Sequence, residues 1–288
     1  MVSVVEKEIG AKKIYYLHIT KRTKLAYENK DLYLGSSLPD NIREKKLDFF
    51  ISTLDDQLLE ISNLIKKNKK DLPRTIKEKN LLDFSIKFTY NSNKIEGNTL
   101  NLRESYLLLK DQISPRRAIK DIKEIQDHQK LFLELIKDRQ IINRENLLKW
   151  HHRLLKETNK DVAGKIRNYS VEIAGCKFKP PTPIELDFEL TDFFNWYNRN
   201  KNKYNAVIFS ALIHLKLVTI HPFGDGNGRI SRLLMNLVLN NNNFPLFIIE
   251  NKDRKSYYSV LERSQIKNDD SYFLNWFIKK YILFLKNN

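Results

Sequence analysis

The stretch that decides the fold is LIHLKLVTIHPFGDGNGR, residues 212–229, where an apolar segment runs directly into a cluster of glycines. The whole chain has 288 residues and only 8 glycines, so three of them within five positions is a marked local feature. Apolar residues recur at helical spacing on both sides. The pattern predicts two helices, 204–220 and 228–240, joined by a short glycine-rich turn.

This turn has the features of an anion-binding site. The second helix is expected to begin within residues 226–228, and the first turn of a helix carries unpaired amides and a partial positive charge. Glycines let the backbone approach an anion because no Cβ is in the way. Arg229 and Arg232 are three positions apart, and two guanidiniums beside a nest of amides suit a polyphosphate. The stretch therefore predicts a phosphate cradle.

Two side chains beside the cradle can carry chemistry. Asp225 can hold a divalent cation through one carboxylate, with phosphates and water completing the shell. His221 ends the preceding helix, where Pro222 stops the regular run, and an imidazole can act as a base near neutral pH. The alternative is an ordinary turn between helices with His221 as a capping residue. A P-loop and a Rossmann fingerprint are both excluded, since GxxxxGK[ST] is absent and the preceding segment is helical.

The rest of the chain predicts a mainly α fold with one domain. Residues 2–34 have the short β-branched and aromatic runs of a small β-meander, and residues 40–70 have the spacing of one long amphipathic helix. Residues 164–183 alternate β-branched and polar residues around a central Ala-Gly, which predicts an inserted β-hairpin. Asn101 and Glu104 resemble a capping box. Further helices are expected over 78–96, 101–113, 115–137, 143–157, 184–199, 253–264 and 270–286.

Composition and charge restrict the class of protein only loosely. The chain has 51 Lys and Arg against 35 Asp and Glu, a net charge of +16, which favours polyanionic partners. Lys and Asn are frequent throughout, however, and no zinc-finger, RRM or basic-zipper pattern occurs. The lone Cys176 fits a reducing compartment, and we expect neither a signal peptide nor a membrane span. The expectation is a cytoplasmic protein with no membrane partner; a homodimer and binding to nucleic acid stay open.

HPFGDGNGRISR, residues 221–232, resembles the core motif of the Fic (Fido) family, HxFx[D/E]GNGRxxR, at every defined position. The resemblance implies a Fic-type helical bundle and the transfer of AMP from ATP to a Ser, Thr or Tyr hydroxyl of a target protein. Together with the β-meander, it divides the chain into a β appendage over 1–38, a helical region over 39–141 that carries the inhibitory motif, and the Fic core over 142–280.

The resemblance implies a role for each residue of the motif. His221 would deprotonate the target hydroxyl, Asp225 would hold Mg²⁺ or Mn²⁺, and Arg232 would receive the γ-phosphate of ATP. The remaining residues would line the phosphate nest: Gly226, Asn227, Gly228 and Arg229. Gly228 stands where the kinase-like branch of the family has a lysine, which favours nucleotidyl transfer over phosphorylation.

Two other stretches fit the same family. Residues 164–181 resemble its flap, which binds the target segment as an added strand so that the hydroxyl faces the base. Four flap residues would lie over the nucleotide, namely Ile173, Ala174, Gly175 and Cys176. Tyr257 and Tyr258 fall where the family packs an aromatic pair near the adenine. The alternatives are a hairpin without this role and an aromatic pair that belongs to the core.

SNKIEGN, residues 92–98, has the features of a built-in brake. Ser92 and Glu96 share one helix face, and Gly97 is expected just past the helix end. A carboxylate in the last turn opposes the helix dipole, so Glu96 needs either a cation or full solvation. The stretch is similar to the family's inhibitory motif [S/T]xxxE[G/N], which implies that Glu96 pairs with Arg232 and blocks the γ-phosphate.

The sequence therefore favours an autoinhibited protein adenylyltransferase that binds ATP, with self-modification left open. Within enzymes the alternatives are removal of AMP and transfer of another nucleotide. A nucleic-acid-binding regulator is the alternative from a different class.

Overall fold

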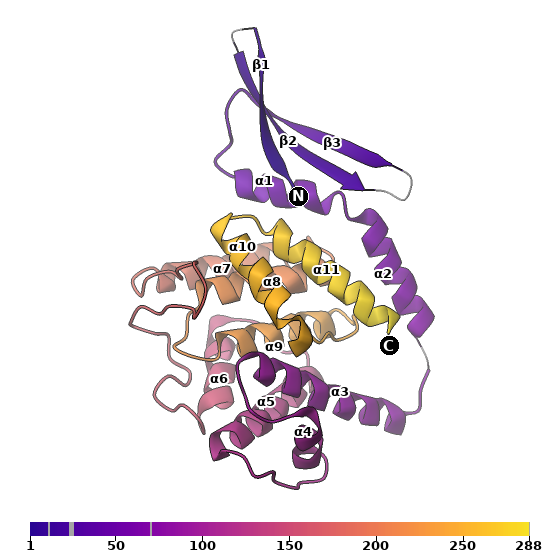
Figure 1. Cartoon of the computed structure of the whole chain (residues 1–288), viewed down its shortest axis with the longest axis vertical. Helices are drawn as coiled ribbons and strands as arrows, with labels where there is room; N and C mark the ends of the chain where they lie inside the picture. The colour runs from indigo at the N-terminus through magenta and orange to yellow at the C-terminus, as the bar shows by residue number, and fades with distance from the viewer. Residues whose placement is uncertain (11, 23–25, 70, 288) are drawn as a thin grey trace.

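The computed structural model describes residues 1–10, 12–22, 26–69 and 71–287. A body of helices carries a three-stranded sheet that projects from one end (Figure 1). The sheet is antiparallel, in the order β1 (Ser3–Ile9), β2 (Lys12–Arg22) and β3 (Tyr27–Gly35). The predicted β-meander is confirmed.

One face of the sheet is attached to the helical body. Leu17 and Ile19 of β2 are 0% and 4% exposed, and Val4 of β1 lies directly opposite Leu17. These side chains belong to the same buried cluster as Leu47 and Phe50 of helix α1 (Ile42–Ile51). The sheet is therefore held by burial of apolar surface against α1, while β3 is largely exposed.

The single long helix predicted over 40–70 is wrong. The structure has two helices, α1 and α2 (Asp55–Asn68), separated by a break at residues 52–54. The hydroxyls of Ser52 and Thr53 donate to the carbonyls of Phe49 and Phe50 at 2.8 and 2.7 Å, which competes with continued helix bonding. Asp55 and Asp56 then favour a new helix start. Lys70, at the end of the predicted helix, lies outside the described residues.

The remaining helices follow the predicted pattern, and the mainly α class is confirmed. They are α3 (Arg74–Ile95), α4 (Leu102–Leu109), α5 (Ile119–Lys137), α6 (Arg144–Leu155), α7 (Leu186–Asn200), α8 (Ala206–Ile220), α9 (Asn227–Asn241), the 3-10 turn η1 (Asn251–Asp253), α10 (Arg254–Ile266) and α11 (Ser271–Lys286). The capping box of Asn101 and Glu104 is present at the start of α4. No helix in the described part of the chain is both long and apolar enough to cross a membrane.

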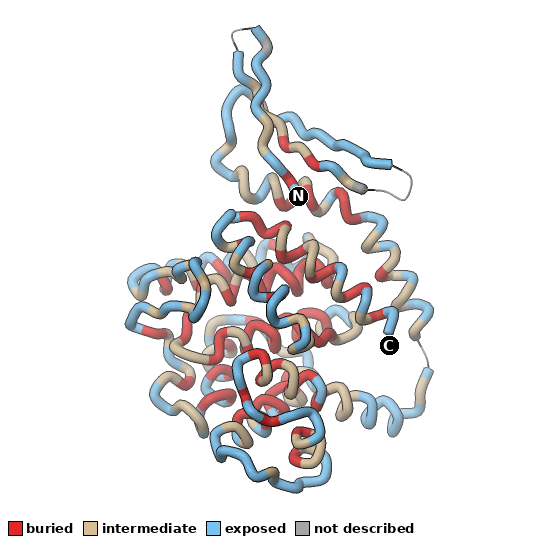
Figure 2. Tube along the Cα trace, viewed as in Figure 1, coloured by how far each residue is buried: buried red, intermediate tan, exposed pale blue. Residues whose placement is uncertain are grey.

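Helix α8 lies at the centre of the body. Every residue from Ala206 to Leu215 is buried, which is typical of a helix surrounded by other elements. Figure 2 shows that buried residues gather inside the helical body, whereas the projecting sheet is largely exposed. Its opposite faces belong to two clusters: Ile208 and Leu212 face the cluster that includes α11, whereas Phe209 and Ile213 face the cluster that includes α5 and α6. The glycine-rich turn after α8 is thus positioned by the core itself.

The β-hairpin predicted over 164–183 is wrong, because no residue of this fully described segment is in a strand. From Val171 to Pro180 exposed and half-buried residues largely alternate, so the period of two reflects an extended chain with one side against the body. A turn closes at Ile173–Cys176, where the Cys176 amide donates to the Ile173 carbonyl at 3.0 Å. Prolines at 180, 181 and 183 lack the amides that a ladder requires.

Candidate active site

The turn between α8 and α9 is fixed by two residues in the left-handed backbone region. His221 caps the end of α8 with φ of 51°, and Gly226 precedes α9 with φ of 78°. A Cβ on Gly226 would lie 3.2 Å from Leu155 Cδ1 and 3.3 Å from His151 Nε2, so the position requires glycine on grounds of both space and conformation. The predicted start of the helix within 226–228 is confirmed.

Asn227 and His151 hold this turn from inside. The Asn227 side chain exchanges two hydrogen bonds with the backbone of Phe223, at 3.0 and 2.8 Å, and is 2% exposed. The ring of His151 from α6 stacks on Phe223, and its Nε2 donates to the Asp225 carbonyl at 2.9 Å. The Gly164 amide donates to its Nδ1, which fixes the tautomer, and burial lowers the pKa of His151 to about 4. Sequence reasoning missed His151, whose only signal is a His-His pair in α6.

The imidazole of His221 is arranged as a base. Its Nδ1 lies 3.2 Å from the Val218 carbonyl, which can only accept, so Nδ1 carries the proton and Nε2 keeps a free lone pair. Burial lowers the pKa of His221, and the nearby charge of Arg167 acts in the same direction. The ring is therefore neutral at neutral pH, and it lines the cleft described below.

Asp225 is ionised and faces Arg229. Its Oδ1 accepts from the Gly226 amide at 2.5 Å and from Arg229 Nη2 at 2.9 Å. Burial opposes the charged form, yet these partners lower the pKa of the carboxyl. Among the described residues no group of three or more His, Cys, Asp or Glu could hold a metal ion. A lone carboxylate fits the predicted arrangement, in which Asp225 and the phosphates of a ligand share the cation.

Arg229 faces α5 as well as the motif. Its side chain is 3% exposed, and Nη1 lies 3.3 Å from Oε1 of Glu124. The other oxygen of Glu124 accepts from Asn98 at 3.1 Å. The Arg229 guanidinium therefore links Asp225 of the motif to Glu124 and, through it, to Asn98 at the end of the predicted brake.

The ion pair between Arg232 and Glu96 is present at 2.7 Å. Arg232 is 1% exposed and also donates to Ser92, to Oγ at 3.0 Å and to the carbonyl at 2.8 Å. Gly97 follows with φ of 101°, at the predicted helix end. A Cβ on Gly228 would overlap Oε1 of Glu96, so this carboxylate lies directly over the first turn of α9, where an anion is favoured.

Two buried histidines that sequence reasoning missed surround Arg232. His128 of α5 contacts Ser92 Oγ at 3.1 Å, and His214 of α8 contacts the Tyr257 hydroxyl at 2.9 Å. That hydroxyl accepts from Arg232 Nη1 at 3.3 Å. Burial lowers the pKa of both histidines, and the charge of Arg232 lowers it further, so both are neutral. A permanent cation is thus enclosed by neutral partners and one carboxylate.

A cleft of about 590 Å³ joins the stretches that the sequence singled out. Its lining includes Ile173, Ala174, Gly175, Cys176, His221, Gly228, Tyr257, Tyr258 and Glu96. The tip of the flap segment is attached to α10, because the Lys177 amide donates to Glu262 at 2.7 Å. Tyr257 is 1% exposed, whereas Tyr258 is 39% exposed and presents part of its ring. The volume suits a ligand the size of a nucleotide.

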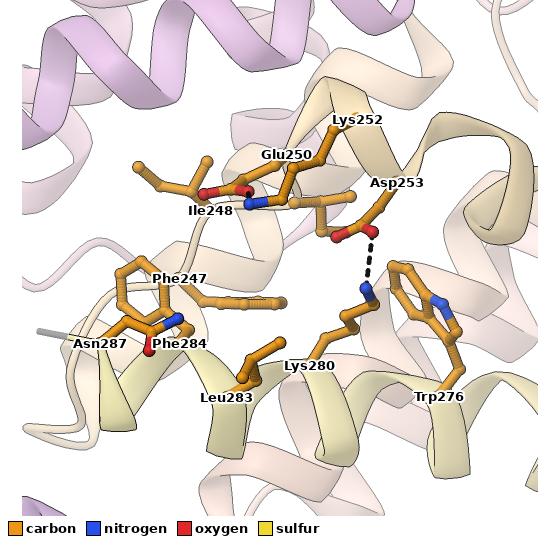
Figure 3. A pocket seen from close by; sticks show the side chains of 11 residues that line it. Phe247, Ile248, Glu250, Lys252, Asp253, Trp276, Lys280, Leu283, Phe284 and Asn287 are labelled. Atoms are coloured by element: carbon orange, nitrogen blue, oxygen red, sulfur yellow. Dashed lines mark hydrogen bonds and ion pairs between the residues drawn. The ribbon is translucent and has the colours of Figure 1, made fainter.

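A second hollow near the C-terminal helix is different in kind. Figure 3 shows Lys280 of α11 reaching Asp253 across it, at 2.5 Å. Its volume is about 60 Å³, enough for a few waters only. The cleft at the α8–α9 turn is the candidate active site because His221, Gly228 and Glu96 line it together.

Comparison with known proteins agrees with this geometry. Residues 141–239 match the model of the Fic/DOC family, and this span contains α8, the turn and nearly all of α9. The fold and the site define a Fic/DOC domain, and the chain carries it. Over 181 residues the chain is 34% identical to the protein adenylyltransferase fic-1 of Caenorhabditis briggsae, a match that covers 60% of this chain and 35% of that protein.

Solved structures extend the similarity to most of the chain. A Fic domain containing signaling protein from Bacteroides thetaiotaomicron superposes with a TM-score of 0.70 at 26% identity, covering 81% of this chain and 94% of that one. Fic-1 from C. elegans gives a TM-score of 0.72 at 23% identity, covering 86% and 75%. The chain spans about a third of the length of the first curated relatives that it matches.

Proposed function

We propose that this protein is a protein adenylyltransferase, which transfers AMP from ATP to a hydroxyl side chain of a target protein. The observation that carries the proposal is the neutral His221, whose Nε2 is free in a cleft that opens over the N-terminus of α9. The names of the relatives support the same activity.

The residues of the cleft can perform this reaction in one step. His221 Nε2 takes the proton of the target hydroxyl while the hydroxyl oxygen bonds to the α-phosphorus of ATP. The bond between the α-phosphorus and the oxygen that bridges it to the β-phosphate breaks, and diphosphate is released. The amides at the start of α9 and the guanidinium of Arg232 stabilise the negative charge of the phosphates. Mg²⁺ or Mn²⁺, bound with the nucleotide and held by Asp225, would neutralise part of that charge.

Autoinhibition by Glu96 is part of the proposal. Its carboxylate occupies the space above Gly228 and pairs with Arg232, so it places a negative charge where the terminal phosphate is expected to bind. Two anions cannot share this position without a large repulsion. Transfer is therefore slow until Glu96 moves away.

The flap segment supports binding of a target as an added strand. Between Val171 and Lys179 no residue is in a strand, and apart from the turn at Ile173–Cys176 and the Lys177 amide its backbone groups form no ladder. Unpaired amides and carbonyls can bond to another extended chain.

The protein's own hydroxyls are a further class of target. The free Cys176 fits the predicted cytoplasmic location.

Labelled ATP tests the proposal. We compare the native chain with Glu96→Gly and with Glu96→Gly/His221→Ala, using ATP labelled at the α-phosphate and following incorporation into the protein itself and into lysate proteins. The Glu96→Gly form is expected to incorporate the most, the double variant none, and modified peptides gain the mass of one AMP group. Absence of incorporation from every form, or incorporation that survives His221→Ala, contradicts the proposal.

Removal of AMP is the second candidate. The Glu96 side chain is 31% exposed and lines the same cleft as His221, so its carboxylate can orient a water toward a bound AMP ester. This candidate predicts the opposite result for Glu96→Gly: release of AMP from a modified protein is lost. The nucleic-acid-binding regulator is favoured instead if no form transfers AMP and if His221→Ala binds nucleic acid as well as the native chain does.

A further inference from the structure

A buried arginine at the base of the flap has no carboxylate partner. Arg167 is 4% exposed, and the ion pairs found within the described part of the chain do not include it. Burial lowers the pKa of its guanidinium. Since a buried charge without a counterion is costly, its place in the fold calls for a compensating set of contacts.

Those contacts are three backbone carbonyls from three separate parts of the chain. The Nε of Arg167 donates to His221 at 2.8 Å, Nη1 donates to Tyr169 at 2.9 Å, and Nη2 donates to Pro181 at 2.5 Å. The backbone amide of Arg167 also donates to the Pro222 carbonyl at 3.0 Å. One planar side chain therefore connects the flap segment with the residue that precedes the glycine-rich turn.

The positions of the three carbonyls allow Arg167 to hold the flap at its base. Tyr169 and Pro181 lie on either side of residues 170–180, the part that lines the cleft, so their joint attachment closes this loop at its base. The Tyr169 hydroxyl also rests on the motif, because a Cβ on Gly224 would overlap it. His221, the third partner, has the left-handed backbone that directs its ring.

We propose that Arg167 is a positioning residue, which fixes the flap relative to His221 so that a hydroxyl held by the flap faces Nε2. This inference rests on the proposed transfer reaction. Arg167 does not touch the reacting atoms; it sets the distance between the element that binds the target and the base. Lysine cannot replace it, because an ammonium is a point donor and cannot reach three carbonyls in one plane.

The charge of Arg167 has a second, separable effect. The charged groups that influence His221 are Arg167 from the flap base, Glu96 from the end of α3 and Asp225 from the turn. Burial lowers the pKa of His221 and Arg167 adds to this, whereas the two carboxylates raise it. Removing the charge at position 167 therefore raises the pKa of the base, and a lysine there keeps it low.

Two substitutions separate the planar contacts from the charge. We place Arg167→Lys and Arg167→Gln in the Glu96→Gly background, with Arg199→Lys as the control, since the Arg199 side chain is 70% exposed on α7. Thermal unfolding checks the fold. Transfer is expected to fall in both variants, by up to about a hundredfold, the loss that a misplacement of 1 Å can cause, with ATP affinity within about twofold. In an NMR titration, the pKa of the His221 imidazole is expected to be higher in Arg167→Gln and unchanged in Arg167→Lys.

Hydrogen exchange provides a readout that does not depend on activity. The amides of residues 170–180 are expected to exchange faster in Arg167→Lys and unchanged in Arg199→Lys. Normal transfer by Arg167→Lys, or exchange of these amides at the parental rate, overturns the inference. If the Glu96→Gly parent transfers no AMP, the proposed function fails, and the exchange and the titration still decide whether Arg167 positions the flap and the base.

Discussion

Oε1 of Glu96 lies 2.7 Å from Nη2 of Arg232, although 136 positions of sequence separate the two residues. Burial alone would lower the pKa of Arg232, but Glu96 reverses the direction and the guanidinium stays charged. The remaining contacts of Arg232 are with neutral groups of Ser92 and Tyr257. Glu96 is thus the anion that balances this cation in the resting state, and a bound phosphate is the natural replacement.

Removing Glu96 is expected to make the protein less stable alone and more responsive to ATP. In Glu96→Ala the Arg232 charge loses its anionic partner, which lowers the free energy of unfolding by about 1–3 kcal/mol. ATP then restores the balance, so its addition raises the melting temperature more in Glu96→Ala than in the native chain. Glu78→Ala, an exposed site on the same helix, is the control. Equal ATP-induced shifts in all three proteins contradict this exchange of anions.

Gly228 is expected to be required for phosphate binding even when Glu96 is absent. A Cβ at this position overlaps the carboxylate of Glu96, which is the end of a flexible side chain and can move. Gly228→Ala should therefore fold, with a melting temperature lowered to about that of Glu96→Ala, because the displaced carboxylate no longer pairs with Arg232. The same methyl group occupies the place of the phosphate, so Glu96→Ala/Gly228→Ala should bind ATP more weakly than Glu96→Ala in calorimetric titrations. Equal affinity means that phosphates bind elsewhere.

Buried neutral histidines predict a loss of stability in mild acid. Burial lowers the pKa of His151 to about 4 from 6.5, so the unfolded chain binds more protons than the native protein between these values. Stability from this group is complete above pH 6.5 and decreases as the pH falls toward 4. From pH 6.5 to 5 the loss is about 1.5 kcal/mol for His151 alone.

Urea unfolding at the two pH values measures this loss. His151→Gln is expected to be less stable at pH 6.5, since the stack on Phe223 is lost, and to show a smaller decrease at pH 5. His152→Gln, with an exposed ring, is the control. If the free energy of unfolding falls by the same amount between pH 6.5 and pH 5 in His151→Gln and in His152→Gln, His151 is not the group that titrates.

The sequence was sufficient for elements whose pattern is local. Apolar spacing predicts the helices on both sides of the turn, and the glycine cluster predicts where the second of them begins. The break between α1 and α2 was missed because apolar spacing continues across Ser52 and Thr53, whose hydroxyls turn back onto the helix. The predicted hairpin failed because alternation reports a half-buried extended chain and says nothing about a pairing partner.

The contacts of the site depend on chain segments far apart, and a local pattern does not contain them. The contact of Arg229 with Glu124 is an example, because Glu124 lies on α5, which no motif connects to the turn. His128, His151 and His214 belong to no motif in the sequence, and their part in the site follows from their burial and contacts. Glu96 and Arg232 were paired in advance only because a family resemblance supplied the partner.

The link between Glu262 and the flap is expected to control how tightly the nucleotide is held. Glu262 Oε1 accepts from the Lys177 amide at 2.7 Å, next to the turn at residues 173–176 that lines the cleft. Glu262→Ala removes this charged acceptor and leaves the tip of the flap unattached, a loss of about 1–2 kcal/mol in local stability. In the Glu96→Gly background ATP should bind more weakly, whereas the rate at saturating ATP changes little because His221 and Arg167 are untouched. Glu262→Gln keeps an oxygen acceptor, so its ATP affinity should lie between that of the Glu96→Gly parent and that of Glu262→Ala. The Lys177 amide reports the change directly by hydrogen exchange, and unchanged exchange together with unchanged ATP affinity in Glu262→Ala would show that the flap is held without this contact.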